Sequence, residues 1–152
     1  MIAAELILGH DENALEQVRK IRHTVFCEEQ AIAKSIEQDG LDASSIHALV
    51  TVSGVAAATG RLLITLDDYI IGRVAVMPQF RNKGLGDLVM RLLIRTAFDM
   101  GAEHQTVHSQ LSAQGFYEKL NFIPQGKPYE EAGIPHITMV RKGDIFGKCQ
   151  FP

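Results

Sequence analysis

A short loop with two glycines and two basic residues is the segment of this sequence best suited to chemistry. It has the sequence Arg81-Asn82-Lys83-Gly84-Leu85-Gly86, between a predicted strand and a predicted helix. The first amides of a helix have no acceptor within the helix, and the helix dipole adds partial positive charge there. Glycines let a ligand approach the backbone, and the basic side chains add full charges. This combination predicts a site for a phosphate or diphosphate.

The loop differs from two common phosphate-binding loops. A dinucleotide fingerprint needs a third glycine three residues after Gly86, where the sequence has Val89. A P-loop needs a lysine and then a serine or threonine after its last glycine, whereas Asp87 and Leu88 follow here. A tight turn that uses glycine only for its geometry is the alternative interpretation. The joint spacing of the glycines and basic residues is rarer than a lone glycine pair, which favours the anion site.

The elements around this loop predict a mixed sheet flanked by helices. Asp11 is the expected N-cap of a helix that runs to about Glu29. Apolar spacing gives that helix an inner face consisting of Leu15, Val18, Ile21, Arg22 and Val25. The other predicted elements are strands at 4–9, 46–52, 55–66 and 69–77, a helix at 87–100, a strand at 104–108, a helix at 113–121 and a strand at 137–141.

The composition excludes several classes of function. With 152 residues we expect one domain that spans residues 1–152. A formal net charge of −3 gives no electrostatic basis for non-specific binding to nucleic acid. No apolar run is long enough to span a membrane, and the N-terminus is a poor signal peptide. The two cysteines, Cys27 and Cys149, lie far apart in the sequence, which favours a reducing, cytoplasmic setting.

Two motifs resemble the GNAT superfamily of acyl-CoA-dependent N-acetyltransferases. Arg81-x-x-Gly84-x-Gly86 matches the family's Q/R-x-x-G-x-G/A pyrophosphate loop. Residues 113–122, with the sequence AQGFYEKLNF, are similar to the family's A-x-x-FYEKLGF segment, with Asn121 in place of the usual glycine. The resemblance implies the GNAT fold. This is an α/β (α+β) architecture with a central mixed, mostly antiparallel sheet of six to seven strands, flanked by about four helices.

Looser patterns narrow the resemblance to the ElaA-like subgroup. They are the segment that begins with Arg22 and ends with Glu28-Glu29-Gln30, the acidic residues between Glu37 and Asp42, and Gly-Ile-Pro-His at 133–136. Many relatives dimerise, so the resemblance is compatible with a homodimer, although the sequence indicates no interface.

The resemblance implies transfer of an acetyl group from acetyl-CoA to a primary amine by direct attack in a ternary complex. The pantetheine arm would pair with the strand at 73–76, and a backbone N–H near Val76 or Met77 would bind the oxyanion. Tyr117 holds the family's general-acid position, although an aromatic packing role is the simpler alternative. The implied cofactor-binding residues are Val74, Val76, Met77, Arg81, Asn82, Lys83, Gly84, Leu85, Gly86, His108, Gln110 and Tyr117.

The base that deprotonates the amine is not identified by these motifs. An amine with a pKa of ~10.4 costs roughly 4 kcal/mol to deprotonate at neutral pH, so some group should assist. The candidates are Glu28, Glu29, His108 and His136, of which Glu29 and His136 are retained as base or substrate contacts. Structural histidines and solvated glutamates are the simpler interpretation of each. Ser112 is expected to cap the next helix.

The acidic segment at 37–42 has two interpretations: a solvated loop, or a negative rim that attracts a cationic amine. It lacks the calcium-loop pattern, and no His-Glu-x-x-His sequence occurs, so no metal is expected. We therefore expect an enzyme whose partner is a small-molecule amine. The alternatives are a non-catalytic acyl-CoA-binding regulatory module and an N-acetyltransferase that acts on proteins or peptides.

Overall fold

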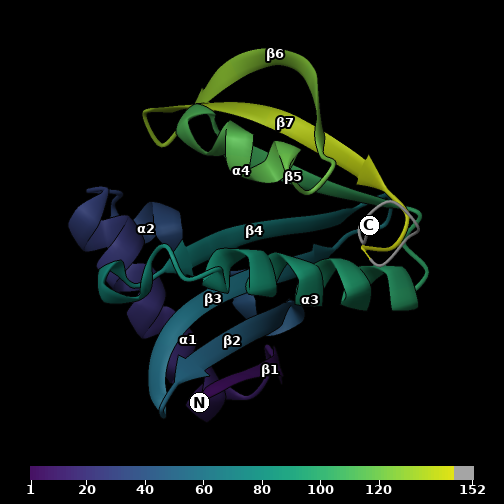
Figure 1. Ribbon diagram of the computed structural model, residues 1–152. Coiled ribbons are helices and arrows are strands. Elements are labelled where there is room, and N and C mark those ends of the chain that lie inside the picture. The colour runs from purple at the N-terminus through teal and green to yellow at the C-terminus, as the bar shows by residue number, and fades with distance from the viewer. Residues whose placement is uncertain (146–152) are drawn as a thin grey trace.

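The computed structural model describes residues 1–145, and its centre is a seven-stranded sheet in the order β1-β2-β3-β4-β5-β7-β6 (Figure 1). β4 and β5 are parallel, and every other neighbouring pair is antiparallel. This confirms the predicted mixed, mostly antiparallel sheet. The strands are β1 (Ile2–Leu8), β2 (Ile46–Val52), β3 (Val55–Ile64), β4 (Tyr69–Val76), β5 (His104–Gln110), β6 (Ile123–Glu131) and β7 (Ile134–Lys142).

Helices cover both faces of this sheet. Within residues 1–145 the α-helices are α1 (Glu12–Arg22), α2 (Lys34–Glu37), α3 (Leu85–Asp99) and α4 (Gln114–Glu118). The short 3-10 and π segments are η1 (His23–Glu29), η2 (Asp42–Ser44), η3 (Pro78–Phe80) and η4 (Leu111–Ala113). In this part of the chain no helix is both long and apolar enough to cross a membrane.

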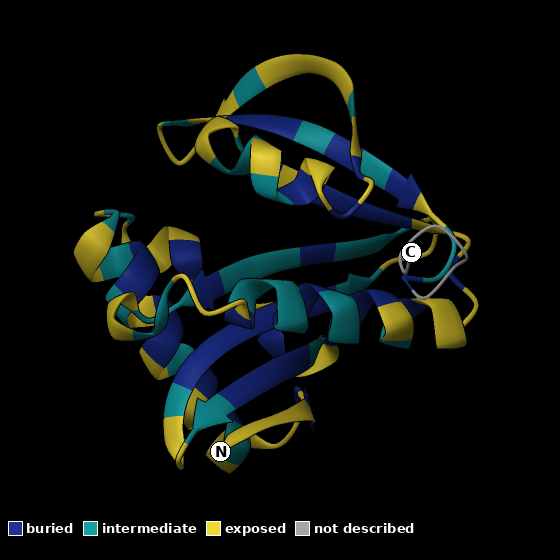
Figure 2. Cartoon of the chain, in the orientation of Figure 1, coloured by how far each residue is buried: buried dark blue, intermediate teal, exposed yellow. Residues whose placement is uncertain are grey.

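Two apolar clusters hold the helices on the sheet. One consists of α3 side chains such as Leu93 packed on Ala48, Leu62 and neighbouring residues. The other packs α1 against the opposite face of the sheet, where Leu49 and other strand side chains contact the helix. Alternate residues of each strand point to opposite faces, so β2 contributes to both clusters. Figure 2 shows that burial is concentrated in the middle of the sheet, whereas β1 and β6 are mostly exposed.

The first helix follows the prediction closely. The Asp11 side chain accepts a hydrogen bond from the Ala14 amide at 3.2 Å, as expected of an N-cap. All five residues of the predicted inner face are buried. The helical path continues to Glu29, but its last seven residues form the π-helical segment η1. A π-helical turn has a wider hydrogen-bonding pattern, which the apolar spacing could not reveal.

Gly60 on β3 lets α3 approach the sheet. A Cβ atom built on Gly60 would lie 2.5 Å from Cγ1 of Val89 and 2.9 Å from Cδ1 of Leu93, closer than real atoms approach. α3 begins directly after Gly84, two residues before the predicted start, and Gly101 with φ +104° follows its end. The sheet therefore fixes the position of the glycine loop that precedes α3.

Two local predictions near the C-terminal half are wrong. α4 is shorter than the predicted helix, and its N-cap is Ala113 without a side-chain bond, because Ser112 lies within the 3-10 turn η4. The edge strand β6 was not predicted, because it is largely exposed and lacks an apolar alternation. Asn121, which stands in place of the family's usual glycine, has φ +69°, a left-handed conformation that asparagine also tolerates.

Candidate active site

The site begins where β4 and β5 separate. These parallel strands pair only at Ile70–Thr106 and Ile71–Val107. Directly afterwards β4 contains a bulge, in which Arg73 and the next residue occupy the space opposite a single residue of β3. A bulge bends its strand, so the rest of β4 diverges from β5, as Figure 1 shows.

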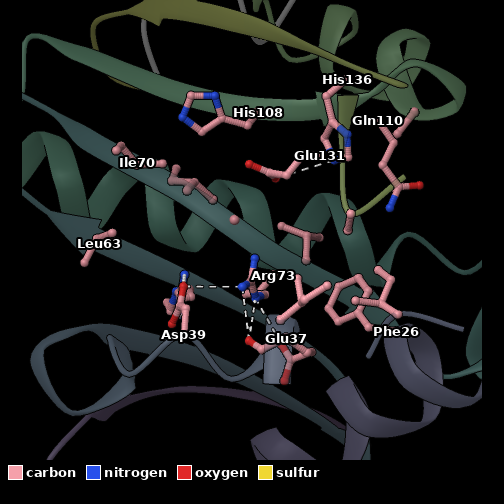
Figure 3. A pocket seen from close by; sticks show the side chains of 18 of the residues that line it. Phe26, Glu37, Asp39, Leu63, Ile70, Arg73, His108, Gln110, Glu131 and His136 are labelled. Atoms are coloured by element: carbon pink, nitrogen blue, oxygen red, sulfur yellow. Dashed lines mark hydrogen bonds and ion pairs between the residues drawn. The ribbon is translucent and has the colours of Figure 1, made fainter. Parts of the chain in front are cut away.

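A cavity of about 570 Å³ lies at this separation (Figure 3). Its walls come from η1, α2 and the segment that follows, from β3 and β4, and from β5, α4 and the β6–β7 hairpin. The volume lies within the usual range for sites that bind small molecules, roughly 300–1,000 Å³. The cavity reaches from Ala113 and Tyr117 near the α4 end to Asp39 and Leu63 at the other end.

The predicted anion loop lies beside this opening at the start of α3. Gly84 has φ +77°, in the left-handed region, and a Cβ there would meet nothing within 4 Å. The glycine is therefore required by backbone conformation rather than by space. The Gly84 carbonyl accepts the first helical bond, from Leu88 at 3.1 Å. The amides of Leu85, Gly86 and Asp87 donate to no other group within residues 1–145, so three donors are available to an anion.

Arg81 does not point its guanidinium toward these amides. Its Nη1 and Nη2 donate to the Glu29 carboxylate, both at 2.6 Å, and its Nε donates to the Val76 carbonyl at 3.0 Å. The hydrogen bonds from Arg81 lower the pKa of Glu29. The structure places Glu29 at this ion pair and not among the cavity-lining residues. The exposed side chain of Lys83 has its Nζ 5.9 Å from the centre of the Phe80 ring.

The predicted oxyanion donors differ in their availability. The Met77 amide donates to the Ala57 carbonyl of β3 at 2.8 Å and is therefore already bonded. Neighbouring residues of an antiparallel strand point their amides to opposite sides, so the Val76 amide points away from β3 into the separation. Val74 lines the cavity. Val76 is thus the better placed of the two predicted donors.

Tyr117 lies on α4 and lines the cavity. Its ring packs edge-on against Phe116 and Phe122, with ring centres 5.0 and 5.8 Å apart. Burial raises the pKa of Tyr117 to about 12, so the phenol keeps its proton at neutral pH. Its hydroxyl makes no hydrogen bond within the described residues, which leaves the donor available to a ligand.

His108, Gln110 and His136 all line the cavity, on the adjacent strands β5 and β7 (Figure 3). His136 Nδ1 lies 2.6 Å from the Ile134 carbonyl, and because a carbonyl only accepts, Nδ1 carries the proton. Nε2, the other ring nitrogen, faces a Glu131 oxygen 3.8 Å away. Sequence reasoning had named His136 but not Glu131.

The other two side chains make polar contacts across the site. His108 Nδ1 lies 2.9 Å from the Tyr129 hydroxyl and 3.2 Å from the Thr138 hydroxyl. Gln110 donates to the side-chain oxygen of Gln30 at 2.8 Å, which connects β5 to the end of η1.

Buried ion pairs fix the wall that follows α2. Arg22 is fully buried and binds Glu37 at 2.8 Å and Asp42 at 2.7 Å. Arg19 approaches Asp42 at 3.5 Å from the surface and is itself paired with Glu12. The acidic segment is therefore neither a solvated loop nor a bare negative rim, since its buried carboxylates are bonded to arginines.

Two further arginines reach the same wall from the sheet. Arg61 binds Asp39 at 2.8 Å and Asp42 at 3.1 Å. Arg73 binds Glu37 at 3.0 Å and Asp39 at 3.3 Å. Partial burial alone would raise the pKa of Asp39, but the hydrogen bonds from Arg61 and the Leu41 amide, with the nearby arginine charges, lower it to about 2. Arg61 and Arg73 were not predicted as site residues. A lone arginine within each of two apolar strand runs was the available signal.

No group of histidine, cysteine or acidic side chains within residues 1–145 is arranged to hold a metal ion. The site thus offers main-chain donors, a buried phenol, imidazoles and carboxylates. A mixed sheet that opens at its parallel pair, with a glycine loop at the start of a helix beside the opening, is the arrangement expected from the resemblance to the GNAT acyltransferases.

Comparison with known proteins identifies the family within that class. The family profile described as "Acetyltransferase (GNAT) domain" matches residues 10–142. The chain belongs to this GNAT acetyltransferase family, as its two motifs predicted.

Individual relatives agree with this assignment. "Protein ElaA" of Escherichia coli is 32% identical over 143 residues, which cover 89% of this chain and 94% of the relative. The crystal structure of E. coli ElaA aligns with a TM-score of 0.84 at 28% identity, over 92% of this chain and 99% of ElaA. An acyl-CoA N-acyltransferase from Pseudomonas aeruginosa aligns with a TM-score of 0.83 at 27% identity, over 93% and 99%. The resemblance to the ElaA-like subgroup is confirmed.

Proposed function

We propose that the chain is an acetyl-CoA-dependent N-acetyltransferase that transfers an acetyl group to a primary amine by direct attack in a ternary complex. A single cavity carries this proposal. It continues from Tyr117, next to the β4–β5 separation, to the charged wall at Asp39 and Arg73. A donor that enters through the separation and an acceptor that lies against that wall would meet inside one cavity.

The proposed donor site fits the groups that are present. The three available amides at the start of α3 suit a diphosphate, because they combine unpaired donors with the positive end of a fifteen-residue helix. The open edge of β4 at Val74 and Val76 would receive the amide groups of the pantetheine arm. When bound, acetyl-CoA supplies the acetyl group as a thioester.

His136 is the proposed base. Its Nδ1–H bond to the Ile134 carbonyl holds the ring in one tautomer, so that Nε2 can accept a proton from the amine. The Glu131 carboxylate faces the same nitrogen and would attract the ammonium form of the acceptor. Loss of the amine proton, which costs roughly 4 kcal/mol in water for a pKa of ~10.4, would then take place within the cavity.

Two donors would stabilise the charges that develop during transfer. The Val76 amide would bind the oxygen of the tetrahedral intermediate, and one such preorganised donor contributes about 3–4 kcal/mol. Tyr117, whose raised pKa keeps it protonated, would donate a hydrogen bond to the departing thiolate. Cys27 is not among the cavity-lining residues, and burial raises the pKa of its thiol, which favours direct attack over an acyl-enzyme. Cys149 lies outside the described residues.

The decisive experiment follows free thiol release from acetyl-CoA with and without amines, alongside calorimetric titration of the protein with CoA. We expect CoA binding and amine-dependent thiol release. Tight binding without any amine-dependent release would instead support the acyl-CoA-binding module. Release with peptides but not with small amines would support an N-acetyltransferase that acts on proteins or peptides.

A further inference from the structure

The part of the cavity next to Asp39 and Arg73, where the acceptor is proposed to lie, has arginines in its wall. Their charges are balanced by carboxylates. Arg73 contacts two carboxylates, Glu37 and Asp39, within 3.3 Å. Arg61 contacts Asp39 through two hydrogen bonds, at 2.9 and 2.8 Å, and also reaches Asp42. With the fully buried Arg22, three arginines and three carboxylates form one charge-balanced network, and Arg19, which approaches Asp42 from the surface, is itself paired with Glu12. An anion placed beside the guanidinium of Arg61 or Arg73 would also lie beside the carboxylates that already bind that guanidinium.

One acidic group in the cavity wall is not balanced in this way. Glu131, at the β6–β7 hairpin, projects toward the cavity from the side opposite Arg73 (Figure 3). Its ion-pair contact within residues 1–145 is His136 Nε2 at 3.8 Å, longer than the 2.7–3.3 Å contacts that join the arginines to Glu37, Asp39 and Asp42. Within residues 1–145 Glu131 is therefore the acidic group of the cavity wall that no arginine or lysine binds.

Apolar side chains line the cavity around these charged groups. They come from η1, the α2 region, β3 and β4, and are Phe26, Ile32, Ile36, Leu41, Leu63 and Ile70. Burial of apolar acceptor surface against these side chains is favourable, at about a fourfold gain in affinity for each buried methylene group.

We propose that the acceptor is a monocationic primary amine with an apolar, uncharged body, and that Glu131 attracts its ammonium group. The inference rests on the proposed function and specifies the acceptor class of the same site. A carboxylate on the acceptor would be repelled by Glu37 and Asp39, whose charges neutralise Arg73. A second ammonium group would lose its hydration among apolar side chains without a free counter-ion.

A matched series of amines tests the proposal on the wild-type protein. Hexylamine, its ω-carboxylate analogue and its ω-amino analogue share one chain and differ only in the terminal group. A charged terminus must stay hydrated and withdraws at least two methylene groups from the apolar wall, so we expect kcat/KM to be at least about tenfold higher for hexylamine. An equal or higher kcat/KM for either charged analogue overturns this inference but supports the proposed function. No thiol release with any amine overturns both.

Two exposed neighbouring glutamates of β6 provide a matched pair of variants. Glu131→Gln removes the charge that no arginine or lysine binds and should raise KM for hexylamine at least about fivefold. Glu130→Gln makes the same chemical change at a residue that does not line the cavity, and KM should stay within twofold. Equal effects of the two substitutions would show that general surface charge, not a specific contact, attracts the amine.

Asp39→Asn tests the charge balance directly. The substitution leaves Arg61 and Arg73 with one carboxylate fewer, so the wall gains a net positive charge. We expect kcat/KM for the ω-carboxylate analogue, relative to hexylamine, to rise at least about fivefold. The ratio compares two substrates on one protein, so a lower yield of folded variant does not affect it. An unchanged ratio overturns the charge-balance argument, and the wild-type series decides the proposal even where this variant fails to fold.

Discussion

Gly84→Ala separates backbone geometry from space in the proposed diphosphate loop. Gly84 has φ +77°, and a Cβ atom there would meet nothing within 4 Å. The substitution therefore creates no clash, and its whole cost is the strain of a left-handed alanine, about 1–2 kcal/mol. Such strain must be measurable either in the folded protein or in the complex with CoA.

The location of the cost depends on whether the free loop relaxes. Residues 82–84 are exposed, so the loop can leave the strained conformation at little expense in the unliganded protein. Binding must then restore it, and we expect Kd for CoA to rise about 5–30-fold, as 1–2 kcal/mol requires. If the loop does not relax, the same energy instead lowers Tm by about 2–8 °C. Calorimetric titration with CoA and thermal unfolding measure the two quantities.

Gly86→Ala is the matched control. Gly86 lies within α3, where alanine is favoured, and the nearest neighbours of its Cβ would be the Phe116 ring and the Val76 side chain, in ordinary contact at 3.4–3.6 Å. We expect Kd for CoA to change less than threefold. The reasoning is refuted if Gly84→Ala leaves both Kd and Tm at their wild-type values, or if Gly86→Ala weakens binding more.

Two further substitutions test other parts of the site. Tyr117→Phe removes a donor to a developing charge, so we expect kcat to fall about 10–100-fold while Kd for acetyl-CoA stays within twofold. An unchanged kcat in steady-state assays would contradict the role of Tyr117 as donor to the departing thiolate. Asp39→Asn should lower the free energy of unfolding by about 1–2 kcal/mol at pH 7, because the folded protein lowers the pKa of Asp39 from 3.8 to about 2. The expected value is at the lower end of what this shift implies, since a quarter of the side chain is exposed to solvent. A lowered pKa stabilises the fold above about pH 4, so the difference between wild type and variant in urea unfolding should shrink as pH falls from 4 to 2. A constant difference would show that the charge of Asp39 does not stabilise the fold.

Local patterns were sufficient to predict several of the elements that form the site, but not β6 or α2. β2 lies where its apolar run predicted it, and Asp11 caps α1 as its position indicated. Both features depend on residues a few positions apart, where spacing alone carries the information. β6 was missed because an exposed edge strand that contains Pro124 and Pro128 buries little apolar surface.

The charged half of the site could not be predicted in the same way. Arg22 and Glu37 are 15 residues apart, and Arg73 and Glu37 are 36 residues apart. Such pairs depend on the tertiary fold, which brings α1 and β4 against the same residue of α2. The sequence contains both signs of charge, but it does not show which carboxylate neutralises which arginine. A cluster of acidic residues alone is therefore a poor indicator of a negative surface.

The same limit applies to the glycine loop, and it changes how the loop would bind an anion. Sequence reasoning assigned two full positive charges to the loop, but the guanidinium of Arg81 is neutralised by Glu29, 52 residues away. Main-chain amides at the start of α3 and the side chain of Lys83 then remain to meet a diphosphate. Amides bind well only when the backbone directs them at one point, whereas a flexible cation tolerates displacement. Affinity for the cofactor should therefore depend more on the conformation of Gly84 than on the number of basic residues in the loop.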